Sequence, residues 1–190
     1  MASTYSDLGL ELMATGENAG TWGTKTNANL NLIEQLTGGH LSVSIAGGAG
    51  TTALDIDDGA LTGTAQQRVL ELTGTISGNR IVTFPVLTEN FYFIKNGTTG
   101  GHTVQLKAAS GSGATVTYST TDKGWKIIYL DGVATNTGLY QLNDLLSGLV
   151  VGTDVQAYDA QLADVAGLAV TNGGFIVGDG SNFVLETGAT

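Results

Sequence analysis

The side chains that could bind a metal are two histidines and one acidic stretch. His40 and His102 lie about sixty positions apart, and neither has an acidic or cysteine partner at the spacing that metal ligands show. Residues 55–59 read Asp-Ile-Asp-Asp-Gly, which is the composition of a calcium loop, but the terminal bidentate glutamate is missing. We therefore interpret the histidines as ordinary loop or strand residues and the acidic stretch as a turn, and we expect no metal.

Three further patterns bear on chemistry. Gly111-Ser112-Gly113 is not followed by a third glycine and a helical pattern, so we expect no dinucleotide site. Asn96-Gly97-Thr98 matches a glycosylation sequon, but without a signal peptide it is better interpreted as a hairpin turn. Glycosidases need two carboxylates facing each other over a cleft, whereas the acidic residues here fall in turns or on polar helix faces. The sequence predicts that the protein is not an enzyme and has no cofactor.

Composition restricts the partners. Seven basic residues against seventeen acidic ones give a net charge of −10, which disfavours nucleic acid and anionic membranes. There is no cysteine, so neither disulfides nor thiolate metal sites are available. No apolar run has the length of a membrane span, and the first residues lack the features of a secretion signal. We expect a protein that is made in a cytoplasm and then assembled.

Residues 41–137 are expected to form an all-β domain. Short β-branched and aromatic runs alternate with Gly, Asn, Asp and Ser, and Ser77-Gly78 and Asn96-Gly97 are strong turn signals. Alternation within the runs indicates one buried and one wet face, so we predict two packed antiparallel sheets in a small β-sandwich or jelly roll. Trp125 alternates within a run and is expected in the core. The expected strands are residues 41–45, 52–56, 68–76, 80–84, 90–95, 103–108, 115–119 and 125–130.

Residues 1–40 form a distinct first segment. Thr26 or Asn27 could cap a short helix that runs to residue 36 and ends at Gly38-Gly39. The segment has too few apolar residues for a core of its own, so we expect it to dock on a partner. For Trp22, which precedes the helix in a glycine-rich loop, local packing and anchoring in a partner are both open. The expected docking residues are Trp22, Leu30, Ile33 and Leu36.

Residues 138–190 form a third segment, of short helices and a hairpin. Thr153 and Gln156 make a capping box, and apolar residues spaced three, four and three follow as a short seam. A helix of that length is marginal alone, so we expect the seam to pack between copies of the chain. Residues 175–185 are predicted to form a hairpin with a Gly-Asp-Gly-Ser turn. The expected interface residues are Val155, Tyr158, Leu162 and Val165.

Three strings of residues resemble tail fibre proteins of tailed bacteriophages. Residues 79–132 contain N-R-x-V-T-F-P, F-x-I-K-N-x-T-T-G-G-x-x-V-x-L-K and I-x-Y-x-D-G. Residues 151–190 contain V-G-T-D-V-Q-A-Y-D-A and G-x-F-I-V-G-D-G-S-N-F-V-x-E-T-G-A-T, and residues 21–31 contain T-W-G-T-K-T-N-A-N-L-N. Residues 41–75 contribute little to the resemblance.

The resemblance implies a structural virion protein: the N-terminal, virion-proximal part of a homotrimeric tail fibre. Its partners would be adaptor- or nozzle-type tail proteins, and a distal region outside these residues would reach the host receptor. It implies a mainly β fold with a short N-terminal helical anchor. It also implies a location in the tail of the virion, after synthesis in the host cytoplasm.

Two other functions remain open. The chain could be a capsid decoration or head-fibre protein, because the N-terminal helix could seat on a capsid as well as on a tail. It could also be a carbohydrate-binding β-module, which would carry exposed aromatic residues on one wet face or in loops. Most aromatic residues lie inside strand patterns, which counts against that module.

Overall fold

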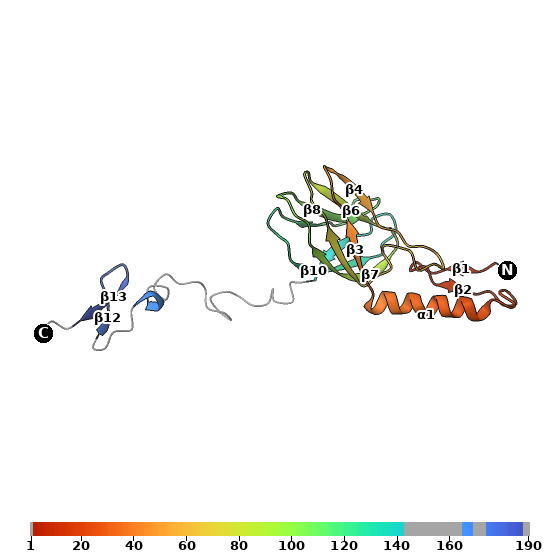
Figure 1. Ribbon diagram of the computed structural model, residues 1–190, viewed down its shortest axis with the longest axis horizontal. Coiled ribbons are helices and arrows are strands. Elements are labelled where there is room, and N and C mark those ends of the chain that lie inside the picture. Colours follow the sequence, from red (N-terminus) through yellow and green to blue (C-terminus); the bar gives the residue numbers. More distant parts are fainter. Residues whose placement is uncertain (1, 143–164, 169–173, 188–190) are drawn as a thin grey trace. The chain divides into compact units, whose positions relative to one another are not determined.

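The computed structural model describes residues 2–142, 165–168 and 174–187 (Figure 1). The chain divides into two compact units, residues 1–143 and 144–190. The described part is mainly β, with several sheets, and its first unit is a small sandwich-like domain, as expected. The elements of the first unit are β1 (Thr4–Tyr5), β2 (Glu11–Leu12), α1 (Trp22–Gly38), β3 (His40–Ser44), β4 (Gly50–Ala53), β5 (Val69–Thr73), β6 (Arg80–Phe84), β7 (Glu89–Asn96), β8 (Val104–Ala108), β9 (Val116–Tyr118), β10 (Trp125–Asp131) and β11 (Leu139–Gln141).

Two sheets face each other in this domain. One has five strands in the order β11-β10-β7-β5-β3, and the other has four in the order β4-β6-β8-β9. The chain passes from the first sheet to the second three times, from β3 to β4, from β5 to β6 and from β7 to β8 (Figure 1). Each passage with its two strands is one coil, and the three coils stack on one another.

This stacking corrects the expected strand pairing. Strands β3, β5 and β7 pair in parallel, and so do β4, β6 and β8. Within these two sheets, the later strands β9, β10 and β11 join through antiparallel pairs. The turn signals at Ser77-Gly78 and Asn96-Gly97 therefore do not close hairpins, because the chain crosses there to the opposite sheet. The alternation of apolar residues is the same for both kinds of pairing, so it could not distinguish them.

Glycines make the corners of the coils possible. Gly47, Gly74 and Gly100 occupy equivalent corners and have φ values of 117°, 103° and 101°, a region that suits glycine. A Cβ atom on Gly100 would lie 2.1 Å from the carbonyl oxygen of Ile76 in the neighbouring coil. Backbone bonds join the corners, for example from the Ile76 N–H to the Thr99 carbonyl at 2.9 Å. The corner at Gly100 thus requires both the left-handed conformation and the missing side chain, whereas the corner at Gly47 requires the conformation alone.

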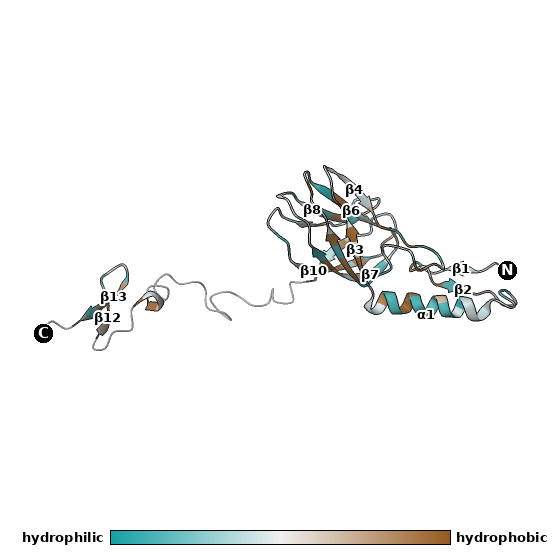
Figure 2. Ribbon diagram, viewed as in Figure 1, coloured by the Kyte–Doolittle hydropathy of each residue, from teal (hydrophilic) through white to brown (hydrophobic). Residues whose placement is uncertain are grey.

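The core lies between the two sheets, where the hydrophobic colouring of Figure 2 is concentrated in the strands. Its largest fully buried side chains include Phe84, Tyr92 and Tyr118. The two buried hydroxyls have partners, since Tyr92 donates to the Ala65 carbonyl at 2.9 Å and Tyr118 to that of Ile94 at 2.6 Å. Burial raises the pKa of Tyr92 to about 12.

The second unit contains the expected hairpin. Strands β12 (Gly174–Gly178) and β13 (Phe183–Thr187) pair antiparallel. The Asp179 carboxylate accepts hydrogen bonds from the Ser181 and Asn182 N–H groups at 2.8 and 2.7 Å, which fixes the turn. Residues 165–167 form one helical turn.

Candidate functional site

Helix α1 begins earlier than the sequence indicated. Thr21 is its N-cap residue and Trp22 lies in its first turn, whereas we expected Thr26 or Asn27 to cap it. The added first turn is held from outside the helix, because Lys25 and Asn29 both contact Glu11 of β2. Tertiary contacts of this kind override the local preference of a Gly- and Thr-rich stretch.

The inner face of α1 is buried. Leu32 is 0% exposed and Leu36, one turn later, is 7% exposed. Leu36 was expected on the docking surface, and its burial within the chain corrects that expectation. The reason is its spacing from Leu32, because residues four apart share one face of a helix.

A polar cluster around Glu11 fixes the first half of α1. The Glu11 N–H donates to Asn29 Oδ1, and Asn29 Nδ2 donates to the Glu11 carbonyl, both at 2.9 Å. Lys25 Nζ lies 2.9 Å from Glu11 Oε2, and Asn18 Nδ2 donates to Oε1 at 3.0 Å. Lys25 and then Asn18 hold the pKa of the Glu11 carboxyl below its usual value. The hairpin β1–β2 and the helix are therefore joined by matched polar groups.

A second polar cluster joins this segment to the β-domain through the buried side chain of Gln66. Gln66 Nε2 donates to the carbonyl of Asp57 at 3.1 Å and to that of Leu8 at 3.5 Å. The helix end is fixed as well, because the Arg68 N–H donates to the Gln35 carbonyl at 3.1 Å. Helix α1 is thus held at both ends by residues distant in sequence.

The outer face of α1 carries large apolar side chains. Trp22 is 64% exposed, Leu30 57% and Ile33 48%. Their spacing of eight and three residues places them in one stripe, which extends about 16 Å along the helix. The structure therefore brings together three of the four expected docking residues, and we call Trp22, Leu30 and Ile33 the outer face of α1.

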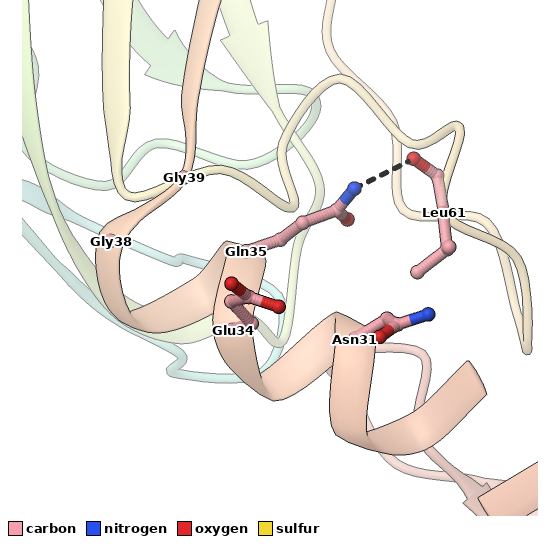
Figure 3. Close-up of a pocket in the computed structure, with 6 residues that line it drawn as sticks. All are labelled: Asn31, Glu34, Gln35, Gly38, Gly39 and Leu61. Atoms are coloured by element: carbon pink, nitrogen blue, oxygen red, sulfur yellow. Dashed lines mark hydrogen bonds between the residues drawn. The ribbon is translucent and has the colours of Figure 1, made fainter. Parts of the chain in front are cut away.

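A polar crevice of about 470 Å³ lies beside the end of α1 (Figure 3). Glu34 supplies the single carboxylate of the crevice, and Gln35 Nε2 donates a hydrogen bond to the Leu61 carbonyl at 3.3 Å. Helix residues and one loop residue form its walls, so the crevice belongs to the contact between α1 and the loop at residues 54–68. Its lining residues are Asn31, Glu34, Gln35, Gly38, Gly39 and Leu61.

Three of the residues considered for metal binding or glycosylation have structural partners. His40 Nε2 lies 3.9 Å from Glu71 Oε2 on an exposed sheet face. Asp55 accepts hydrogen bonds from the N–H and the hydroxyl of Thr64, which lower the pKa of its carboxyl. Asn96 is buried and donates to the Asp122 carbonyl at 2.8 Å, so the sequon side chain is not accessible. Among the described residues, no three His, Cys, Asp or Glu side chains could hold a metal ion together.

Most of the seam expected between copies lies outside the described residues. This applies to Val155, Tyr158 and Leu162. Val165 lies in the helical turn, where its carbonyl accepts from the Leu168 N–H at 3.2 Å. The seam stays a prediction.

A second apolar surface, which was not predicted from the sequence, lies on the β-domain. Five aromatic side chains lie on the outer side of the five-stranded sheet, and Trp125, expected in the core, is 52% exposed there. Its position differs by an odd number from that of the buried Ile128, so the strand period places it on the opposite face. The same period applied to Phe91 and Phe93 could have found this surface. The five are Phe91, Phe93, Trp125, Tyr129 and Tyr140.

No family model, no curated protein and no solved structure matches the chain. In the part of the chain that the structure describes, no helix has both the length and the apolar character needed to span a membrane.

Proposed function

We propose that this chain is a structural virion protein, the N-terminal part of a bacteriophage tail fibre, and that the outer face of α1 attaches it to the tail. The single observation that carries the docking role is the exposed stripe of Trp22, Leu30 and Ile33 on a helix that is fixed at both ends. The phage assignment depends on the three resembling strings of the sequence.

The arrangement of α1 suits attachment. An apolar side chain on a fixed helix loses little conformational entropy when a partner covers it, so most of its burial contributes to affinity. Aromatic and aliphatic side chains of this size are typical anchors of protein interfaces. The partner would be an adaptor- or nozzle-type tail protein with an apolar groove for the helix.

The rest of the molecule would project the host-binding region away from the tail. In this proposal three copies assemble into the fibre, and the seam that contains Val155 and Val165 contributes to their contact. The chain carries out no bond chemistry, and its location is the virion tail.

Particles assembled with a Trp22→Ala, Ile33→Asp double variant test the docking role. We expect a folded chain, checked by circular dichroism, and particles that lack fibres in electron micrographs. Asn31→Asp is the matched control, because it adds one negative charge to another exposed position of α1. Particles of the double variant that keep all their fibres would place the attachment elsewhere in the chain.

A further inference from the structure

The outer side of the five-stranded sheet carries a continuous aromatic surface. We call Phe91, Phe93, Trp125, Tyr129 and Tyr140 the aromatic face. Phe91 pairs with Tyr129 and Tyr129 with Tyr140, so these three residues form one row over the neighbouring strands β7, β10 and β11. Phe93 lies two positions further along β7. Its ring packs edge-on against the Phe91 ring, with 6.0 Å between the two ring centroids.

The aromatic face is large for the surface of a single chain. Phe91, Phe93, Trp125 and Tyr140 are between 38% and 52% exposed. With roughly 200 Å² for each aromatic side chain, these four offer about 350 Å² of accessible surface. Apolar patches of a few hundred Å² mark interaction sites, and a stable interface uses about 800 Å² on each partner. The aromatic face could therefore form the centre of such an interface.

The charged groups of this sheet face have partners within it. Lys95 Nζ lies 2.8 Å from Glu71 Oε1, and the Tyr129 hydroxyl donates to Glu89 Oε1 at 3.1 Å. The Arg68 guanidinium stacks on the Phe91 ring, with Cζ 3.9 Å from the centroid, and donates to Asn90 Oδ1 at 2.8 Å. Asp131 pairs with Glu89 across the strands and contacts Tyr140, so the face carries two cations, Arg68 and Lys95, and three carboxylates. The carboxylates are those of Glu71, Glu89 and Asp131.

The pairing of these groups within the face favours a protein partner over a sugar. A sugar is recognised by protein donors and acceptors that bind its hydroxyls, whereas here the polar groups already bind one another. A protein surface can cover the aromatic rings without separating these pairs.

We propose that a second copy of this chain covers the aromatic face, so that copies of the β-domain associate through their five-stranded sheets. This inference depends on the proposal that the fibre is built from several copies of the chain. The net charge of −10 opposes contact between copies over most of the surface. The aromatic face is largely apolar and has only one carboxylate more than its cations, a small part of that charge, so contact between copies costs least there.

Light scattering of the full chain tests this inference with three variants. Phe93→Glu places a charge in the centre of the aromatic face, and Tyr140→Ala removes a ring at its edge without adding charge. Thr117→Glu is the control, because it adds the same charge at an exposed position of β9 in the other sheet. We expect the wild type and Thr117→Glu to be oligomers. In Phe93→Glu the dissociation constant should rise by roughly 30-fold or more, as for the loss of a central interface residue.

Circular dichroism melts distinguish dissociation from misfolding. If Phe93→Glu does not fold, the oligomeric state of Tyr140→Ala decides whether the aromatic face is the contact. Oligomers that persist in folded Phe93→Glu and Tyr140→Ala would overturn the sheet contact but leave the multi-copy fibre standing. A monomeric wild type would overturn the multi-copy fibre as well. A monomer whose tryptophan emission changes on addition of an oligosaccharide, in the wild type but not in Phe93→Glu, would show that a sugar occupies the aromatic face.

Discussion

The β-domain and the N-terminal segment are held in place by different forces. Between the sheets, aliphatic and aromatic side chains are fully buried, and few polar groups take part. The segment at residues 2–39 instead buries two leucines of α1 and otherwise depends on hydrogen bonds around Glu11 and Gln66. The first kind of stability depends on close packing of apolar side chains, whereas the second depends on each buried donor and acceptor keeping its partner.

This difference explains why α1 can present apolar residues to solvent. The helix does not need its outer face for its own stability, because polar contacts at both ends fix it. A segment held in this way can keep Trp22, Leu30 and Ile33 available for a partner.

The largest expected change in the free energy of unfolding comes from the apolar core of the β-domain. Ile128 is 0% exposed between the sheets, so Ile128→Ala should lower the free energy of unfolding by about 2–4 kcal/mol. Ile127, half-buried on the outer side of the same strand, is the matched position, and Ile127→Ala should cost less than half as much. Urea unfolding measures both, and equal losses would contradict the assigned faces of β10.

Replacement of Gln66 tests the hydrogen bonds that hold the N-terminal segment on the β-domain. Gln66→Ala should cost about 1–3 kcal/mol, because the Asp57 N–H and carbonyl lose a buried partner. Gln105→Ala, at a half-buried position on the outer side of β8, is the control and should stay within about 0.5 kcal/mol. If the two variants unfold at the same urea concentration, Gln66 does not join the segment to the domain.

Acid should weaken the N-terminal segment through protonation of Glu11. The folded pKa of Glu11 lies below its ordinary value of 4.5, so its contribution is complete above pH 4.5 and is lost as the pH falls through the folded pKa. Hydrogen exchange of the α1 amides over that range measures the loss. Glu11→Gln should remove this pH dependence, whereas Glu34→Gln, on an exposed position of the same helix, should retain it.

The smallest effect is expected on the outer face of α1. Trp22→Ala should change the free energy of unfolding by no more than about 0.5 kcal/mol, because the side chain is 64% exposed. A loss comparable to that of Gln66→Ala would mean that Trp22 stabilises the chain itself, and the docking role would then lose its support.

Alternation and turn residues were sufficient to predict a mainly β domain and the hairpin near residue 180. They could not predict parallel stacking, because residues that pair in parallel, such as Val69 and Phe93, are joined by nothing visible in the local pattern. Helical spacing is a local signal, and it was sufficient to place Leu30 and Ile33 on one helix face. It did not predict that Trp22 belongs to the helix or that Leu36 is buried, because tertiary contacts determine both. The Glu11 and Gln66 clusters could not be predicted either, since each joins residues that are far apart in sequence.

The stacked coils also set how the length of this domain could vary. Val69 pairs with Phe93 and Arg80 with Val104, so from the second coil to the third both sheets have the same offset of 24 residues. A duplication of that length would add one rung to both sheets at once and keep every inward residue inward, provided that it carried its corner glycine. The first coil pairs with the second at larger offsets, because His40 pairs with Val69 and Gly50 with Arg80, so loops between the strands accommodate extra residues without breaking the stack. The domain could therefore gain length in two ways, as a whole added rung or within a loop of an existing rung.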